Sequence, residues 1–338
     1  MGFREATARL IRTSLAALAA AAVVFALGAC GDDGDGDTAG NANAKPVTTL
    51  KVSVLPITDL APLYIGMERG FFAAEGLKVQ PQLARTGGPV PIAAVQSGDA
   101  QFGWTNTTSL IIARSRGLKL KIVTRGARAG RPSQAAKSGG GLILVKRDSP
   151  VKSLKDLEGK TIAVPTLNGI TTLTTSRALE KRGGDPSKLK FVEVPFPQAL
   201  PVLESGRVDA AFVAEPFATG GLQAGHRSIS RPLVETAPDY ITAGFFATDK
   251  YIADNKDVVD RFRRAVHRSF EYAAAHPEAI REVIPTYTEI SPKLASKITV
   301  PDFSRYTDTS TIELTADLAK KYGYIEEKPD LSELLYQP

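Results

Sequence analysis

The hydrophobic pattern of the chain alternates, from about residue 50 onward, between short apolar runs and amphipathic segments. The short runs have strand length and end at Pro, Gly or polar residues, whereas the segments between them have helical periodicity. The predicted strands of this first half are residues 50–55, 77–83, 100–104, 120–124 and 141–146, and the predicted helices are 61–72, 90–96 and 109–115. Strands that alternate with helices predict an α/β fold with mainly parallel sheets.

The pattern then starts again in the second half. Strands are predicted at 161–164, 190–194 and 210–213, with helices at 171–181 and 199–204, and a strand at 243–248 precedes a long helix at 257–275. Segments 95–103 and 203–212 resemble each other, since each has a helix end, a glycine (Gly98 or Gly206) and then a strand. A glycine at such a helix end commonly adopts the left-handed conformation. The repetition predicts two lobes of similar build.

The first thirty residues have the pattern of a secretory signal. Arg4, Arg9 and Arg12 precede an apolar stretch at 14–27, and Leu27-Gly28-Ala29-Cys30 follows. The last four residues resemble the bacterial lipobox, which implies cleavage before Cys30 and a diacylglycerol on its sulfur. The alternative is a plain signal anchor in which Cys30 is incidental. The apolar stretch is short for a bilayer span, which needs about 20 residues.

The segment after Cys30 is rich in Gly and Asp and then in other small polar residues. This composition predicts a disordered tether over residues 30–48, following a signal peptide over 1–29. A calcium site in the Asp-Gly run is the alternative, but the run lacks the terminal bidentate Glu of an EF-hand loop.

The composition excludes several classes of protein. Charged residues make up 23% of the chain and the formal net charge is +6, without a basic run interleaved with aromatics, so we expect no nucleic-acid partner. Cys30 is the single cysteine, so no intramolecular disulfide is possible. The three histidines have no metal-ligand spacing, and we expect neither a metal nor a cofactor.

The most specific stretch is the segment 61–72, Ala-Pro-Leu-Tyr-Ile-Gly-Met-Glu-Arg-Gly-Phe-Phe, followed by Glu-Gly-Leu at 75–77. Further agreement lies at 97–100, 154–160 and 203–216. These segments resemble the nitrate/sulfonate/taurine and thiamine-precursor binding proteins, the SsuA/THI5-like, NMT1-type family, over roughly residues 50 to 250.

The resemblance implies a type II periplasmic-binding-protein fold, with a ligand cleft between two α/β lobes. Lobe I would comprise residues 49–148 and 246–338, lobe II residues 149–245, and the crossings 141–149 and 241–250. The family delivers small solutes to an ABC permease and its ATPase. We therefore expect a monomeric lipoprotein, held on the outer face of the membrane or in the periplasm through Cys30.

Ligands of open α/β sheets bind outside the carboxyl ends of the strands. The loops at these positions give the candidate ligand-binding residues, which are Thr58, Asp59, Tyr64, Thr86, Gly88, Trp104, Thr105, Asn106, Thr166, Asn168, Gly169, Thr171, Thr172, Phe196 and Glu215.

Several of these residues have two interpretations. The helix start at 169–172 can bind an anion through its N–H groups, or Thr171 and Thr172 can simply cap it. Trp104 can sandwich a planar ring with Tyr64 or pack below the cleft. Three others have a structural alternative, namely packing for Phe196, helix capping for Asp59 and hinge bonding for Glu215.

The rival functions are an enzyme of the same fold and a ligand-presenting receptor accessory. Menaquinone-route lyases and the yeast-type pyrimidine synthase resemble this architecture, but the latter depends on a cysteine-rich motif that the chain lacks. No catalytic constellation is evident, so we expect no enzyme and name no catalytic residue. The basic, Gly-rich segment 125–140 predicts a mobile surface loop, with an anion site as its alternative. The aromatic candidates favour an organic solute over bare nitrate.

Overall fold

The computed structural model describes residues 47–131, 140–303 and 309–337. The residues from Lys45 onward form one compact unit. The predicted signal peptide, Cys30 and nearly all of the predicted tether lie outside the described residues. Within the described ranges, no helix combines the length and the apolar character needed to cross a membrane.

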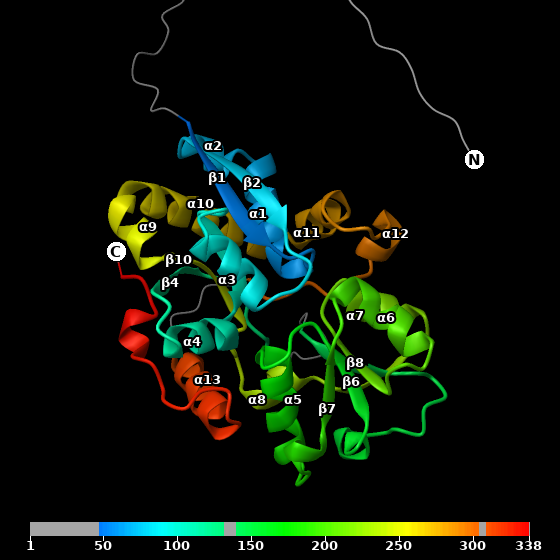
Figure 1. The fold of residues 1–338 in the computed structure, drawn as a ribbon. Helices are drawn as coiled ribbons and strands as arrows, with labels where there is room; N and C mark the ends of the chain where they lie inside the picture. The colour runs from blue at the N-terminus through cyan, green and yellow to red at the C-terminus, as the bar shows by residue number, and fades with distance from the viewer. Residues whose placement is uncertain (1–46, 132–139, 304–308, 338) are drawn as a thin grey trace, which may run out of the picture. The chain divides into compact units, whose positions relative to one another are not determined.

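The first lobe is built on a five-stranded sheet in the order β2-β1-β3-β10-β4 (Figure 1). β10 is antiparallel to both of its neighbours, and β1 pairs in parallel with β2 and β3. The strands are β1 (Thr48–Val54), β2 (Leu77–Leu83), β3 (Phe102–Asn106), β4 (Leu120–Arg125) and β10 (Ala243–Thr248). The helices between them are α1 (Ala61–Glu68), α2 (Phe71–Ala74), α3 (Pro89–Gln96) and α4 (Thr107–Ser115).

The second lobe repeats this architecture, with its sheet in the order β7-β6-β8-β5-β9. β5 is the antiparallel strand here, as β10 is in the first lobe. The strands are β5 (Leu142–Val145), β6 (Thr161–Val164), β7 (Lys190–Glu193), β8 (Ala210–Val213) and β9 (Arg227–Ser230). The helices are α5 (Ile170–Glu180), α6 (Phe196–Glu204), α7 (Phe217–Gln223) and α8 (Pro232–Thr236). The predicted α/β class with mainly parallel sheets is confirmed.

The repeated glycine motif occupies equivalent places in the two lobes. Gly98 ends α3 with a φ of 82°, and Gly206 ends α6 with a φ of 71°. The strands that follow, β3 and β8, hold the same position in the order of their sheets. A left-handed glycine therefore turns the chain from helix to strand at the same point of each lobe.

The last third of the chain is helical. It forms α9 (Asp249–Asp254), α10 (Lys256–Ala275), α11 (Pro277–Val283), α12 (Pro292–Ala295) and α13 (Ser310–Lys321). Short 3₁₀ turns occur at Thr58–Leu60, Leu154–Leu157, Pro186–Lys188, Ile284–Thr286 and Leu331–Glu333. α10 packs on α1 and α2, whereas α13 packs on α4 of the first lobe and also contacts α5 of the second.

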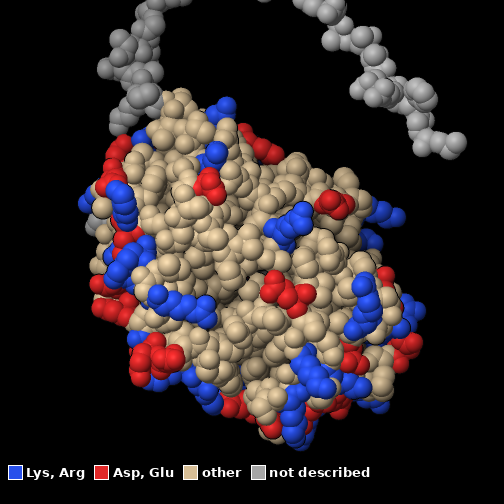
Figure 2. Space-filling view, viewed as in Figure 1, with Lys and Arg blue, Asp and Glu red and all other residues tan. Residues whose placement is uncertain are grey.

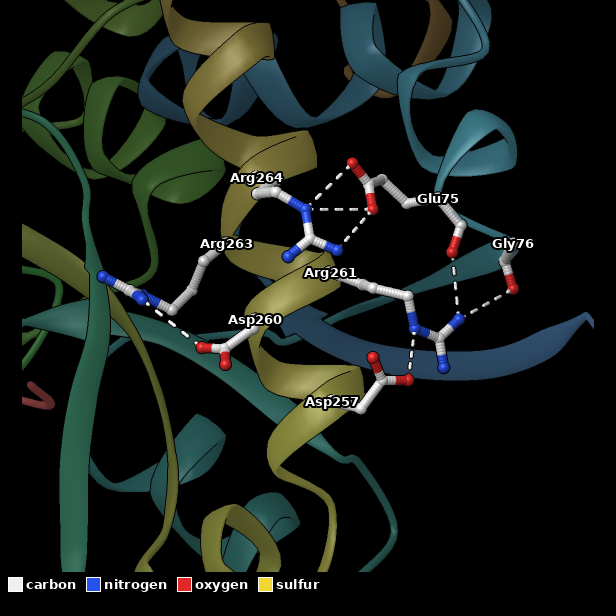
Figure 3. A network of polar contacts seen from close by, with 7 residues as sticks. All are labelled: Glu75, Gly76, Asp257, Asp260, Arg261, Arg263 and Arg264. Carbon is white, nitrogen blue, oxygen red and sulfur yellow. Dashed lines mark hydrogen bonds and ion pairs between the residues drawn. The ribbon is translucent and has the colours of Figure 1, made fainter. Parts of the chain in front are cut away.

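Arginines of α10 tie this helix to the first lobe (Figure 3). The buried Arg261 donates to the backbone carbonyl of Glu75, 2.9 Å away, and to the Asp257 carboxylate. Arg264 forms an ion pair with the Glu75 side chain at 2.8 Å. Because a guanidinium presents several donors in one plane, these residues fix α10 against the turn that precedes β2.

The positions of the two crossings correct the predicted lobe limits. Strand β5 was assigned to lobe I but pairs in the second sheet, and residues 243–245 were assigned to lobe II but lie in β10 of the first. The chain therefore crosses between β4 and β5 and again between β9 and β10, rather than at 141–149 and 241–250. A short apolar run such as β5 carries no information about which sheet it joins.

Two smaller predictions are also wrong. The helix predicted over 61–72 breaks into α1 and α2 because Gly70 takes a φ of 71°. The described start of the segment predicted as a surface loop, residues 126–130, is largely buried. It lies beside the second crossing, since the Ala129 N–H donates to the Tyr240 carbonyl at 2.8 Å and the Thr242 N–H to the Ala127 carbonyl at 3.0 Å. The two crossings thus form a paired, two-stranded connection between the lobes.

Candidate functional site

A cavity lies between the lobes, at the carboxyl ends of the parallel strands of both sheets. The first lobe contributes Ile57, Asp59, Gly87, Trp104 and Asn106 to its wall. The second contributes Pro165, Thr166, Ile170, Thr171, Phe196 and Glu215, and the crossings contribute Arg128, Ala129, Gly140, Gly141 and Thr242. Ala243, the first residue of β10, also lines the cavity. The remaining lining residues are Phe212, Ala214, Leu233 and Pro301.

The lobes touch each other across this cavity at two points. The backbone N–H of Thr58, after β1, donates to the carbonyl of Glu215, after β8, at 3.0 Å. Gly88, after β2, approaches Thr166, after β6, so closely that a Cβ on Gly88 would lie 2.7 Å from the Thr166 methyl carbon. Gly88 also has a φ of 64°, so both its conformation and this close approach favour glycine.

Three buried polar groups on the cavity wall have no hydrogen-bond partner among the described residues. They are the indole N–H of Trp104 and the hydroxyls of Thr166 and Thr171. Each of these side chains is 4% or 5% exposed. Leaving a buried donor unpaired costs roughly 1–3 kcal/mol. Such groups therefore mark a place where a further molecule can supply the missing partner.

Two carboxylates line the same cavity, in different surroundings. Glu215 is held in place, because one oxygen accepts from the Thr219 N–H at 3.0 Å and the other from the Thr219 hydroxyl at 2.8 Å. Burial raises the Glu215 pKa. No hydrogen bond or ion pair of the described residues involves the Asp59 carboxylate. Burial, and then the nearby charge of Glu215, raise the Asp59 pKa to about 7.

The positive charge at the cavity is already compensated. Arg128 forms ion pairs with Asp239 and Asp302, each at 2.6 Å. Sequence reasoning did not select Arg128, although the basic character of 125–140 had pointed to that segment. On the visible face of the molecule, Lys and Arg alternate with Asp and Glu and form no patch of one sign (Figure 2).

Tyr64 does not line the cavity and is not paired with Trp104 across a ligand space. Its ring stacks on Tyr287, with the centroids 3.9 Å apart and the planes 4° from parallel. The Tyr287 hydroxyl donates in turn to the Ile57 carbonyl at 3.1 Å. Tyr64 therefore supports the loop after β1 from behind, and Trp104 lines the cavity without it.

Gly88, Thr105 and Asn106 brace the first lobe's side of the cavity. The Gly88 N–H donates to the Thr105 hydroxyl at 3.0 Å, which joins the loops after β2 and β3. The side-chain amide oxygen of Asn106 accepts a hydrogen bond from the Ser109 N–H at 2.9 Å and caps α4. Asn106 also lines the cavity, whereas Thr58, Thr86, Gly88 and Thr105 are not among the lining residues.

At the start of α5, two neighbouring threonines differ in role, one as a helix cap and the other as a residue of the cavity lining. The Thr172 hydroxyl accepts from the Gly169 N–H at 3.1 Å and from the Tyr324 hydroxyl at 2.9 Å, so Thr172 caps the helix. Thr171, by contrast, lines the cavity, and its buried hydroxyl has no partner among the described residues. Asn168, Gly169 and Thr172 lie outside the lining, and Asn168 is exposed with a φ of 50°.

The remaining predicted residues lie where the strand-end rule places them. Phe196 lines the cavity and stacks on Phe217 at 6.2 Å, so it combines both of its interpretations. Asp59 does not cap a helix, because Ile57 and Leu60 hold the N-cap positions there. The lining residues outside the candidate list have several origins. Some lie in the strand-end loops themselves, namely Ile57, Gly87, Pro165 and Ala214. The others lie where the rule gives no signal: in the crossings (Arg128, Ala129, Gly140, Gly141 and Thr242), in strands (Phe212 and Ala243), in helices (Ile170 and Leu233) and at Pro301.

The chain is similar to known binding proteins. The family model described as NMT1/THI5 like matches residues 57–280, which is more than half of the chain. The riboflavin-binding protein RibY of Chloroflexus aurantiacus is 27% identical over 70% of this chain and 66% of its own length, just under two thirds. A putative ABC transporter periplasmic binding protein of Brachyspira hyodysenteriae is 24% identical, over 79% of this chain and 76% of the relative.

Solved structures share the fold. The alkanesulfonate-binding protein SsuA of Xanthomonas axonopodis, bound to MOPS, superposes with a TM-score of 0.73 at 14% identity and covers 87% of this chain and 100% of its own. The desulfurization enzyme DSZB superposes with a TM-score of 0.60 at 17% identity, over 85% of this chain and 96% of its own. Likeness of fold alone therefore does not separate binding from catalysis. By the extent of its match to the family model, the chain belongs to the NMT1/THI5-like family.

Proposed function

We propose that the protein is the extracytoplasmic solute-binding component of an ABC importer, and that it holds a small organic solute in the cavity between its lobes. The observation that carries this proposal is the set of unpartnered, buried polar groups on the walls of both lobes, Trp104 on one side and Thr166 and Thr171 on the other. A solute that contacts both walls favours the closed arrangement of the lobes, because the open one offers it only half of these contacts.

The paired crossings are suited to act as the hinge of this motion. Their backbone bonds, Ala129 to Tyr240 and Thr242 to Ala127, join two short segments and leave each sheet intact. The lobes can then rotate about this connection while the strand ends separate. In the proposed cycle, the closed form docks on the permease and the solute leaves when the lobes part.

The proposed location follows from the sequence of the first thirty residues. A signal with a lipobox-like end exports the chain and leaves Cys30 as its lipidated first residue, anchored to the outer face of the membrane. We expect a Cys30→Ser variant to appear in the soluble fraction without a lipid mass, whereas the wild-type chain partitions into detergent. A wild-type chain that stays in the cytosol with Cys30 unmodified would contradict this location.

An enzyme of the same fold is a second candidate, favoured by one observation. Asp59 has a pKa of about 7 in the cavity, which suits a general acid or base. The described lining contains no Ser, Cys, His or Lys, and no hydrogen bond of the described residues joins Asp59 to its hydroxyl side chains, which are Thr166, Thr171 and Thr242. Binding without chemistry accounts for the site with fewer assumptions.

A thermal-shift screen of the chain from Lys45 separates these functions. The set comprises alkanesulfonates, nitrate, thiamine precursors and flavins, each tested at several concentrations. A bound solute stabilises the folded protein by mass action, by about 2.7 kcal/mol when its concentration is a hundred times Kd. The unfolding midpoint therefore rises with the solute concentration. If no compound raises the midpoint and mass spectrometry finds one converted to a product, the transport proposal is wrong and the enzymatic one replaces it.

A further inference from the structure

The charges around the cavity are unfavourable for a simple anion. Asp59 and Glu215 both line it, and their charges interact. Arg128, the cation of the described lining, pairs with Asp239 and Asp302, and Asp239 also pairs with Arg131. These two cations and two carboxylates together carry no net positive charge. An anion placed here would lose its hydration and meet carboxylates, and both effects oppose binding.

The two carboxylates differ in what they can offer a ligand. Glu215 uses both of its oxygens on Thr219, and the Thr299 N–H lies 3.4 Å from one of them. Asp59 is engaged by no hydrogen bond or ion pair of the described residues, and no helix uses it as a cap. Asp59 is therefore the carboxylate with accepting capacity left for a ligand.

The donors lie on other parts of the wall. Thr166 and Thr171 flank the start of α5, and Trp104 lies in the middle of β3. Asp59 lies after β1, whose end meets Glu215 of the second lobe, whereas Thr166 meets the loop after β2. The cavity thus has a region that accepts hydrogen bonds and another that donates them.

We propose that Asp59 determines the specificity of this cavity by accepting a hydrogen bond from a cationic or N–H nitrogen of the solute, while Trp104, Thr166 and Thr171 bind an acceptor group elsewhere on the same molecule. The solute class is therefore a zwitterion or a heterocycle that carries both a donor nitrogen and an acceptor. Nitrate and unsubstituted alkanesulfonates have no such nitrogen and are excluded. This inference rests on the proposed binding function.

Calorimetric titration with matched compounds tests the inference. Taurine and ethanesulfonate differ by an amino group. Riboflavin and a pyrimidine thiamine precursor are further compounds with donor nitrogens, and nitrate is a further anion without one. The titrations are run at pH 8, where Asp59 with a pKa of about 7 is largely ionised. We expect the best nitrogen donor to bind at least tenfold more tightly than ethanesulfonate or nitrate.

Substitutions assign the preference to Asp59. We expect Asp59→Asn to lower the affinity for the best nitrogen-donor compound at least tenfold. Thr171→Val, in the region that donates hydrogen bonds, should lower the same affinity several-fold. Asp254→Asn removes a carboxylate that is exposed and paired with Lys250, and it should leave the affinity within twofold. Thermal unfolding of both proteins at pH 5, where Asp59 of the folded wild type is protonated and therefore as uncharged as Asn, verifies that Asp59→Asn is folded.

The possible outcomes distinguish a failure of the role proposed for Asp59 from a failure of the proposed solute-binding function. Equal binding of ethanesulfonate and the nitrogen donors, or an unchanged affinity in Asp59→Asn, overturns the inference while binding itself stands. If none of the compounds binds the wild-type protein, the proposed function fails together with the inference.

Discussion

Thr171 and Thr172 are neighbours with opposite surroundings. The Thr172 hydroxyl is bonded to the start of its own helix and to Tyr324, whereas the Thr171 hydroxyl is buried against the cavity without a partner. A hydroxyl that already has partners contributes to folding, and one without a partner is available to a ligand.

Valine substitutions should separate these two roles. We expect Thr172→Val to lower the free energy of unfolding by about 1–3 kcal/mol, because three hydrogen bonds of the Thr172 hydroxyl are lost. Thr171→Val should leave the unfolding midpoint unchanged or raise it, and should weaken solute binding several-fold. Denaturant unfolding and calorimetry measure the two quantities. The assignment would be wrong if Thr172→Val weakened binding while Thr171→Val lowered stability.

The raised pKa of Asp59 makes stability depend on pH. Its ordinary pKa of 3.8 rises to about 7 in the fold, so between these values the folded chain holds a proton that the unfolded chain releases. The resulting stabilisation is fully present below about pH 4 and is lost as the pH rises through 7. The groups around Asp59 are Glu215, which raises its pKa, and the tyrosines Tyr64 and Tyr287.

The unfolding midpoint of the solute-free protein should therefore fall between pH 5 and pH 8 by roughly a few °C. Differential scanning calorimetry of wild type and Asp59→Asn measures the effect, and the variant should lose most of this dependence. An identical slope in both proteins would show that other groups titrate in this range.

The strand-end rule found part of the cavity wall from sequence alone. Asp59, Trp104, Asn106, Thr166, Thr171, Phe196 and Glu215 all line it, because parallel strands carry their following residues to one edge. Arg128 and Thr242 could not be found this way, since they lie in crossings whose path depends on tertiary pairing. Tyr64 was misplaced because its stacking partner, Tyr287, lies in a distant helical segment of the sequence.

At the scale of elements, the loop after β2 and the loop after β6 meet across the cavity. Gly88→Ala would place a Cβ 2.7 Å from Thr166, so the lobes could not approach as closely. We expect solute affinity to fall roughly tenfold or more, because the closed arrangement loses stability. Calorimetry with the best binder measures this change.

Gly98→Ala is the matched control for this substitution. Gly98 also has a positive φ, of 82°, but a Cβ there would meet no atom within 4 Å. Both variants place an alanine at a positive φ and strain the backbone, whereas Gly88→Ala alone obstructs the contact between the lobes. Equal affinities in the two variants would contradict a role of this contact in binding.

α13 provides a further contact between the lobes. Glu180 of α5 accepts from Lys321 at 2.5 Å and from the Tyr322 hydroxyl at 3.1 Å. Glu180→Gln should weaken solute binding about two- to fivefold, since a partly exposed ion pair contributes up to about 1 kcal/mol. Glu327→Gln breaks the exposed pair with Lys320 and should not change the affinity. Calorimetry measures the solute affinity of both variants. Equal affinities would show that the contact between α13 and α5 does not contribute to closure of the lobes.

Most elements were predictable from sequence because their periodicity is local. β6, β8 and β10 have the predicted bounds, and the glycine motif located the helix-to-strand turns. The sheet to which β5 belongs was not predictable, because it depends on pairing with β8 and β9. β9 itself, Arg-Ser-Ile-Ser, is too polar and short to be distinguished from a loop.

At the scale of the molecule, the two similar lobes explain why the cavity lies where it does. Each sheet directs the ends of its parallel strands toward the other, and two paired crossings connect them. The chemical character of the cavity is then set by a few residues on each side. The central claim is that one solute contacts both sides at once.

A crystal structure of the protein with its tightest solute tests this claim most directly. We expect the solute to lie between the lobes, with a nitrogen at the Asp59 carboxylate and an acceptor within hydrogen-bond distance of Thr171 or the Trp104 indole. A solute bound on the outer surface, or one that contacts a single lobe while the residues of the other keep their unpartnered groups, would contradict it.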